Sequence, residues 1–210
     1  MSERSEVWLW NRQSGELAAA ALIDEMGEDE VAAAASLWKP CIDARIAALV
    51  SEQRPRDDWP EHAHWDWRSK AHHVAGILAY KILGIECAGD VQGLMLIATE
   101  GKACQLADQR GKPLVYVHFL ATAPWNDPDF VPAPRFGGAG KVLLAAAMQI
   151  SIESGYRGRI GLHSLPQAIP FYASCGMSDL GEDAGQDGHD LHYFEMTPEQ
   201  TAEFMARGNR

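Results

Sequence analysis

The sequence predicts an α/β fold with one mixed β-sheet flanked by helices. Strand-like and helix-like segments follow one another in the order β-α-β-β-β-α-β-α-β along the chain. A β-like run that ends at Thr122 and an apolar helix that begins near Val142 enclose a glycine-rich turn, residues 135–141. Alternation of strands and helices is typical of a sheet that buries its faces under helices. We therefore expect a functional turn between a strand and a helix of such a sheet.

The first 79 residues are expected to supply one strand and several helices. Residues 6–11 alternate in polarity, which predicts a short strand. Residues 15–25 and 29–52 are rich in Ala and Leu, which favours two helices. Pro40 lies inside the second helix and should kink or split it, because proline removes a main-chain hydrogen bond.

The segments after residue 79 begin with a β pattern. Residues 79–87 and 91–98, joined by a Gly-Asp turn, predict a hairpin. The remaining expected elements are a strand over 114–122, a helix over 142–153, a strand over 158–165, a helix over 168–177, a glycine- and acid-rich loop over 178–190, a strand over 190–196 and a terminal helix with Pro198 at its first position.

Composition and charge exclude several classes of function. The net charge of −11 argues against a nucleic-acid partner, because binding to phosphates depends on clustered Lys and Arg. No apolar run approaches the roughly 18 residues of a membrane span, and no signal-peptide core follows the first residues, so we expect a cytoplasmic protein without a membrane partner. The four cysteines form no Cys-x-x-Cys pair and the histidines match no zinc spacing, so no metal site is expected.

The segment Arg-Phe-Gly-Gly-Ala-Gly-Lys, residues 135–141, has the chemistry of a pyrophosphate-binding turn. Glycines let several main-chain N–H groups converge on an anion, and the positive end of the following helix faces the same point. A Walker-type loop would need glycine at Arg135 and Ser or Thr at Val142, and a dinucleotide fingerprint would need glycine at Leu143. The spacing that remains is Arg-x-x-Gly-x-Gly.

This spacing resembles the acetyl-CoA turn of the GNAT (Gcn5-related N-acetyltransferase) family. Residues 114–124 resemble the family's fourth strand, which ends in apolar-x-apolar-x-Pro before the turn. Residues 168–177, Ala-Ile-Pro-Phe-Tyr-Ala-Ser-Cys-Gly-Met, resemble the family's Ala-x-x-apolar-Tyr-x-x-x-Gly-Phe helix. The resemblance extends from about residue 80 to residue 197 and leaves everything before Tyr80 unmatched.

The resemblance implies the GNAT fold, a mixed central sheet flanked by helices. In that fold the fourth and fifth strands, here 115–122 and 159–164, splay apart around the pantetheine arm of the cofactor. It also implies a single domain over residues 1–210. That domain would consist of a divergent part over 1–79 with the first strand and helices, an acetyl-CoA-binding core over 80–197 and a terminal helix over 198–210.

The cofactor residues are carried over from the same resemblance, with acetyl-CoA as co-substrate. Main-chain groups of Leu120 and Thr122 would pair with the pantetheine amides, and the Leu120 N–H could polarise the thioester oxygen. The diphosphate would be held by the turn residues Arg135, Gly137, Gly138, Ala139, Gly140 and Lys141. An ordinary glycine-rich loop is the alternative.

The catalytic residues are predicted from the resemblance and from strand alternation. Tyr172 matches the family tyrosine that can protonate the leaving thiolate, although a tyrosine there can also serve only to pack the helix. No carboxylate lies between Leu114 and Trp125 to act as base. Strand alternation places His118 on one face with Tyr116, where an imidazole of ordinary pKa could accept a proton. A core histidine is the alternative, and Tyr116, Glu86 and a water chain stay open as bases.

Two departures from the family pattern bear on the cleft. Leu165 stands where the family usually has an asparagine that bonds the cofactor arm, so that bond is lost or taken by Ser164. The loop over 125–134 is longer than usual and carries three prolines, which makes it either a wall of the acceptor pocket or an inert insertion.

The acceptor is expected to be a small-molecule or lysine amine. Trp59, Trp65 and Trp67 could offer aromatic faces to a cation, with acidic residues of 178–190 completing the site, or they could pack a helix onto the sheet. These observations predict an acetyl-CoA-dependent N-acetyltransferase that acetylates a primary amine by direct transfer. A non-catalytic acyl-CoA sensor is the second hypothesis, and a homodimer stays open.

Overall fold

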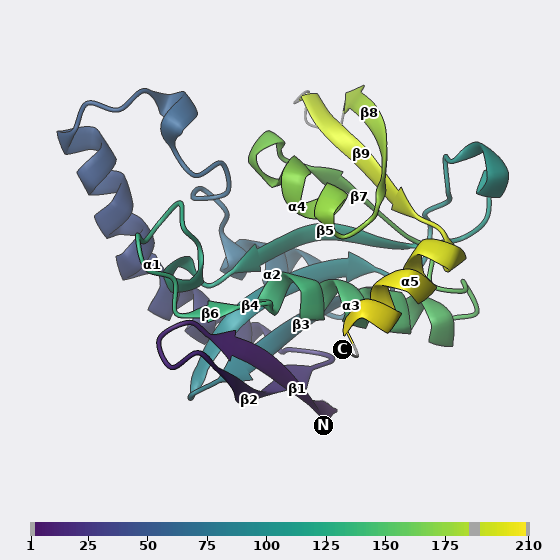
Figure 1. Cartoon of the computed structure of the whole chain (residues 1–210), viewed down its shortest axis with the longest axis horizontal. Helices are drawn as coiled ribbons and strands as arrows, with labels where there is room; N and C mark the ends of the chain where they lie inside the picture. Colours follow the sequence, from purple (N-terminus) through teal and green to yellow (C-terminus); the bar gives the residue numbers. More distant parts are fainter. Residues whose placement is uncertain (1–2, 185–189, 209–210) are drawn as a thin grey trace. The chain divides into compact units, whose positions relative to one another are not determined.

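The structure, a computed structural model, describes residues 3–184 and 190–208 (Figure 1). The chain forms two compact units, Met1–Met95 with Leu120–Leu143 (unit 1) and Leu96–Phe119 with Leu144–Arg210 (unit 2). Each unit is assembled from separate stretches of the chain. The expectation of a single domain over residues 1–210 stays a prediction.

Unit 1 contains a mainly antiparallel set of strands and two helices. The strand order is β6-β1-β2-β3-β4. The elements are β1 Arg4–Asn11, β2 Glu16–Ile23, α1 Glu28–Ser51, η1 Arg56–Asp58, α2 Trp67–Val74, β3 Tyr80–Cys87, β4 Asp90–Ala98, η3 Pro124–Asn126 and β6 Phe136–Gly137. Strands β3 and β4 follow each other in the chain and are neighbours in the sheet, which confirms the expected hairpin. The last residues of β4 belong to unit 2.

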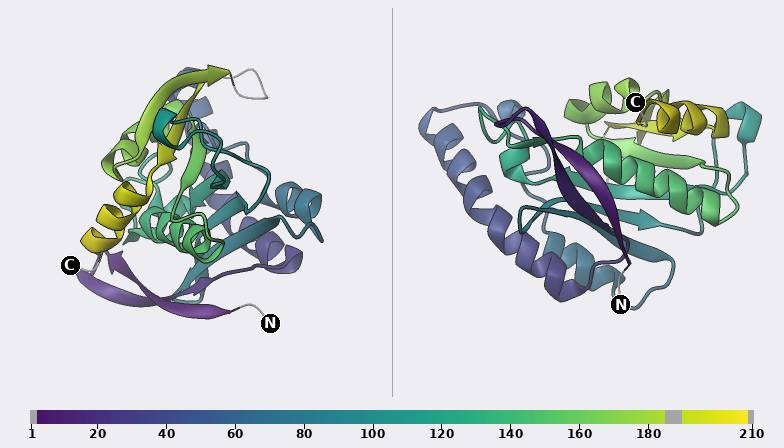
Figure 2. Two further views of the ribbon diagram at one scale, coloured as in Figure 1. Left: turned by 90° about the vertical axis from the view of Figure 1, so that its right-hand side faces the viewer. Right: turned by 60° about the horizontal axis from the view of Figure 1, so that its bottom comes forward.

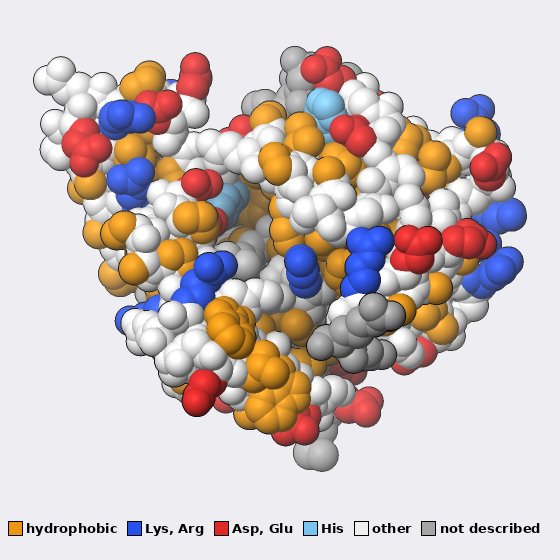
Figure 3. All heavy atoms as spheres, viewed as in Figure 1, with side chains coloured by type: hydrophobic (Ala, Val, Ile, Leu, Met, Phe, Trp, Pro, Cys, Tyr) orange, Lys and Arg blue, Asp and Glu red, His pale blue; other side chains and the backbone are white. Residues whose placement is uncertain are grey.

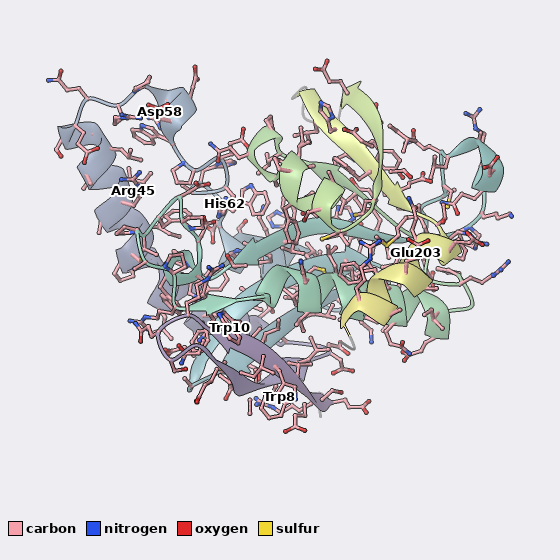
Figure 4. The ribbon with its side chains drawn as sticks, viewed as in Figure 1. Trp8, Trp10, Arg45, Asp58, His62 and Glu203 are labelled. Carbon is pink, nitrogen blue, oxygen red and sulfur yellow. The ribbon has the colours of Figure 1, made fainter. Side chains whose placement is uncertain are left out.

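Strand β1 shows the alternation expected of it. Leu9 is fully buried, whereas Trp8 and Trp10 are about half exposed. Figure 4 labels both tryptophans, and Figure 3 shows apolar side chains gathered in the same region. The period of two in the sequence therefore separates a core face from an exposed face.

The helix expected over residues 15–25 is wrong, because these residues form strand β2. Strand β2 pairs with β1 over its whole length: Glu16 lies opposite Asn11, and Ile23 lies opposite Arg4. The end of β2 also pairs with β3. The hairpin turn is built by Asn11, whose Oδ1 accepts from the Gln13 N–H at 2.9 Å, and by Gly15 at φ 70°. Pairing on both edges outweighs the helix preference of the alanines.

Of the two expected effects of Pro40, a kink or a split, the split is wrong, because α1 runs unbroken from Glu28 to Ser51 (Figures 1 and 2). The kink stays a prediction. Trp38, two residues before the proline, is buried and donates from Nε1 to the Val91 carbonyl at 3.0 Å. Leu49 is buried beyond the proline. Packing on both sides of Pro40 holds the helix together despite a local cost of about 3 kcal/mol.

Unit 2 contains a mixed set of strands in the order β5-β7-β9-β8. Strand β5 pairs in parallel with β7, and the other pairs are antiparallel. The elements are η2 Ala107–Gln109, β5 Val115–Thr122, α3 Ala139–Glu153, β7 Ile160–Ser164, η4 Pro166–Ala168, α4 Ile169–Ser174, β8 Ser178–Ala184, β9 Asp190–Met196 and α5 Pro198–Gly208. The last residues of β5 and the first turn of α3 belong to unit 1.

The loop expected over residues 178–190 is wrong in its first half. Ser178–Ala184 forms β8, which pairs with β9 and has a bulge between Asp179 and Glu182. Charged side chains and a bulge are usual on an edge strand, because they discourage pairing with another chain. The rest of that expected loop, 185–189, lies outside the described residues.

Helix ends agree with the local signals. Helix α5 begins at Pro198, where Thr197 and Gln200 cap each other: the Thr197 N–H donates to Gln200 Oε1 at 2.8 Å and the Gln200 N–H to Thr197 Oγ1 at 3.3 Å. Helix α3 begins at Ala139, three residues before the expected start.

Among the described residues, no helix has the length and apolar character needed to cross a membrane.

Candidate functional site

The glycine turn and the start of α3 lie together in unit 1. Gly138 has φ 96°, a conformation that L side chains rarely adopt, and its ideal Cβ position is open. The Val142 N–H donates to the Gly138 carbonyl at 3.0 Å, so the amides of residues 139–141 precede the first intrahelical bond. These amides and the helix dipole favour an anion at this end of the helix.

Two main-chain hydrogen bonds, one through its carbonyl and one through its N–H, hold Arg135 in place. Its carbonyl accepts from the Arg12 N–H at 2.8 Å, and its N–H donates to the Trp125 carbonyl at 3.0 Å. Its guanidinium lies 5.7 Å from the centre of the Trp125 ring. The Arg12 guanidinium lies 3.3 Å from the ideal Cβ position of Gly137. Arg12 therefore adds positive charge at the turn, a contribution that no local sequence pattern announces.

Gln92 holds the loop that leads into the turn. Its side chain is buried, and its Oε1 accepts from Trp125 Nε1 at 2.9 Å and from Asn126 Nδ2 at 2.8 Å. Its Nε2 donates to the Cys87 carbonyl at 2.8 Å. Asn126 Oδ1 in turn accepts from the Phe136 N–H at 2.9 Å. This network ties both ends of the 125–134 loop to the hairpin.

Leu120 and Thr122 lie at the end of β5, in the same unit as the turn. Strand β5 pairs in parallel with β7 at its beginning, where Val115 lies opposite Ile160 and Val117 opposite Leu162. Strand β5 itself continues beyond these pairs to Thr122. Both residues are half-buried. All eight expected cofactor residues are thus in unit 1, which fits a cofactor laid along the end of this strand.

Tyr172 lies in unit 2, on α4, and is 7% exposed. Its ring contacts those of Phe171 and Phe194, with centroids 5.1 and 5.8 Å away. Burial, helped by Cys175, raises the pKa of Tyr172 well above its ordinary value. The hydroxyl therefore stays protonated at neutral pH, as a proton donor must. Ser164 Oγ, on β7 of the same unit, donates to the Leu165 carbonyl at 2.9 Å, so its proton is used within the chain.

His118 has an environment that disfavours its charged form. Burial, with smaller contributions from Lys102 and His163, lowers the pKa of His118 to about 4. Its ring stands edge-on to the Tyr116 ring at 4.7 Å. The expectation of an ordinary histidine pKa at this position is therefore not met, and its role as base stays a prediction that this environment weakens.

The two other expected bases are engaged in contacts. The Tyr116 hydroxyl lies 2.5 Å from His163 Nδ1, and His163 Nε2 lies 3.2 Å from Asp183 Oδ2. Burial raises the pKa of Tyr116 to about 12, so it is a poor base at neutral pH. Glu86 forms an ion pair with Arg4 at 3.0 Å.

The tryptophans expected at the acceptor side divide into two kinds. Trp67 is buried and stands edge-on to Trp38 at 6.5 Å, which is a packing role. Trp59 has the Arg56 guanidinium 3.9 Å from its ring centre, and Trp65 has Lys70 Nζ at 5.3 Å. These two rings already face cations of the chain itself.

Two hollows of unit 1 lie along the segment that carries these rings. An open one of about 520 Å³ is lined by Ile46, Arg56, Asp57, Trp59, Pro60, Glu61, Ala63 and His64. A small one of about 20 Å³ is lined by Trp38, Ile42, His62, Trp65, Trp67, Ala121, Thr122, Pro124 and Phe130. Through Phe130, the proline-rich loop forms part of the second wall. Within residues 3–184 and 190–208, no three His, Cys, Asp or Glu side chains gather as a metal site.

Comparisons with solved structures agree with this geometry. The chain is similar to an uncharacterized protein (bh2621) from Bacillus halodurans, with a TM-score of 0.62 at 10% identity over 98% of this chain and 95% of that one. It is also similar to aminoglycoside acetyltransferase AAC(6')-Ib in complex with coenzyme A and kanamycin, with a TM-score of 0.54 at 13% identity over 88% and 98%. A third similar structure is the GNAT domain of S. lividans PAT, with a TM-score of 0.51 at 15% identity over 92% and 96%.

No protein-family model matches the sequence, and no curated protein matches it. The class that the architecture defines is a mixed α/β protein with a large sheet flanked by helices. The chain has the GNAT fold.

Proposed function

We propose that this protein is an acetyl-CoA-dependent N-acetyltransferase that moves an acetyl group to a primary amine. The observation that carries the proposal is the glycine turn at the start of α3. It combines Gly138 at φ 96°, main-chain amides that precede the first intrahelical bond, and the side chains of Arg135 and Lys141. Similar structures support it, because one of them is an acetyltransferase with coenzyme A and kanamycin bound.

In the proposed reaction the cofactor lies along the end of β5 with its diphosphate on the turn. The Leu120 N–H polarises the thioester oxygen, and Thr122 pairs with the pantetheine arm. The neutral amine attacks the carbonyl carbon, a C–N bond forms and the C–S bond breaks. The Tyr172 hydroxyl gives its proton to the thiolate, and a base takes the proton that the amine loses.

The acceptor is proposed to be a cationic small molecule or a lysine side chain. The acidic net charge of −11 attracts a cation to the protein as a whole. Acidic side chains of β8, including Asp179, Glu182 and Asp183, add to that charge.

The test is release of free CoA from acetyl-CoA, measured with a thiol reagent against spermidine, kanamycin, amino acids and a lysine peptide. A sample without amine corrects for the four protein cysteines. Release that depends on one amine class supports the enzyme. Tyr172→Phe should lower turnover about tenfold or more while the CoA dissociation constant stays within twofold, because the hydroxyl acts only when the thiolate leaves.

A non-catalytic acyl-CoA sensor is the second proposal. Two properties of β5 favour it. This strand carries no carboxylate, and its histidine has a pKa lowered to about 4. CoA binding to wild type without release for any amine would select this alternative. A tighter affinity for ATP or NAD than for CoA would contradict both proposals.

A further inference from the structure

His62 faces a carboxylate across a short gap in unit 1. Its Nε2 lies 3.4 Å from Asp127 Oδ2, and the two side chains are only 21% and 15% exposed. Figure 4 labels His62, which follows η1 in the chain. A carboxylate at this distance stabilises the imidazolium that forms when a histidine accepts a proton.

Both partners are held in place. The His62 ring lies 5.3 Å from the Phe130 ring at 71° and 5.7 Å from the Trp65 ring at 60°. The other carboxylate oxygen of Asp127, Oδ1, accepts from the Asp129 N–H at 2.9 Å. The loop that carries Asp127 is fixed by the Gln92 network described above. An Asp that orients an imidazole through one ring nitrogen leaves the second nitrogen, here Nδ1, for the substrate.

The His62 ring lines the cavity of about 20 Å³ together with Thr122. A volume of about 10–15 Å³ holds one water molecule, so this cavity has room for one water or one amine group. Its walls are otherwise aromatic and aliphatic. Thr122 is the residue proposed to pair with the pantetheine arm, so the cavity adjoins the proposed path of the cofactor.

The charges around His62 come from several elements. Asp127 and Asp129 lie on the 125–134 loop, and Arg45 of α1 donates from Nε to the Asp129 carbonyl at 2.9 Å. Lys70 of α2 lies over the Trp65 ring. Among these groups, the Asp127 carboxylate is the one in contact with the imidazole.

We propose that His62, oriented by Asp127, is the general base of the acetyl transfer, and that the cavity receives the nitrogen of a primary aliphatic amine. The carbons next to that nitrogen contact Trp65 and Phe130. His62 Nδ1 removes one proton from the amine as the C–N bond forms, and the thiolate takes its proton from Tyr172. This inference rests on the proposed N-acetyltransferase function.

The test uses His62→Gln, Asp127→Asn and a matched control, His64→Gln, whose side chain lines the larger hollow instead. The substrate is whichever of spermidine, kanamycin and a lysine peptide gives the fastest CoA release with wild type. His62→Gln should lower kcat/KM about 100-fold, and Asp127→Asn should lower it about tenfold through kcat, with KM little changed. His64→Gln should stay within twofold of wild type.

A binding readout separates catalysis from folding. The CoA dissociation constant of each variant should stay within twofold of wild type, and added imidazole should restore part of the turnover of His62→Ala. Turnover of His62→Gln within threefold of wild type overturns the base assignment and leaves the acetyltransferase intact. Wild type that binds CoA but releases none with any of the amines overturns both.

Discussion

His62 and His118 are two partly buried histidines beside aromatic rings, and the charged groups near them differ. His62 lies 3.4 Å from the Asp127 carboxylate. His118 has no such neighbour among the causes of its shift: burial, Lys102 and His163 together lower its pKa to about 4. The comparison teaches that a histidine's place on a strand does not by itself set its protonation, because burial and neighbouring charges also act on the ring.

The largest expected effect is a contrast in turnover. His118→Gln should keep kcat/KM within about threefold of wild type, whereas His62→Gln loses about 100-fold, because only the second removes a proton acceptor. Steady-state CoA release at pH 7.5 measures both. A loss of two orders of magnitude in His118→Gln alone would reverse the comparison and return the base to β5.

The next effect is on the loop that positions Asp127. Gln92→Leu should lower the free energy of unfolding by about 2–3 kcal/mol, because Trp125 Nε1 and Asn126 Nδ2 lose a buried acceptor. Urea unfolding followed by tryptophan fluorescence measures it. Gln149→Leu, at an exposed site bonded to Glu153, is the control and should change stability by less than about 0.5 kcal/mol. An equal change in both variants would deny Gln92 its positioning role.

A smaller effect is the acid sensitivity that His118 confers. Its pKa falls from 6.5 to about 4 in the folded chain, so between these values the unfolded state binds more protons and stability falls as pH falls. Since the ring is partly exposed, we expect about 1–2 kcal/mol of this loss between pH 7 and pH 4. His118→Leu should lose less stability than wild type over that range in urea titrations. Equal losses of stability in wild type and His118→Leu would mean that the fold does not lower the pKa of His118.

The smallest effect concerns the cation beside His118. Lys102→Met should raise the pKa of His118 toward its ordinary value, because Lys102 is the second cause of the decrease after burial. The ring proton shifts of His118 in an NMR titration report it. An unchanged or lower pKa of His118 in Lys102→Met would mean that Lys102 does not contribute to the decrease.

Local signals were enough for several elements and for the glycine turn before α3. Glycines followed by an apolar helix, the hairpin of β3 and β4, and the Thr197–Gln200 cap of α5 all depend on residues close together in the chain. The same local reasoning was wrong for β2 and for a split at Pro40. The pairing of β2 with β1 and β3, and the packing of Trp38 and Leu49 on both sides of Pro40, involve partners that local propensity does not contain.

The sequence by itself determined the class of fold and the turn at residues 135–141, because glycine conformation and helix polarity act within a few residues. Only the tertiary structure decided which polar side chains meet. His62 and Asp127 are 65 positions apart, and Gln92 reaches Trp125 across 33. No spacing rule links such pairs, since the folding of intervening elements brings them together.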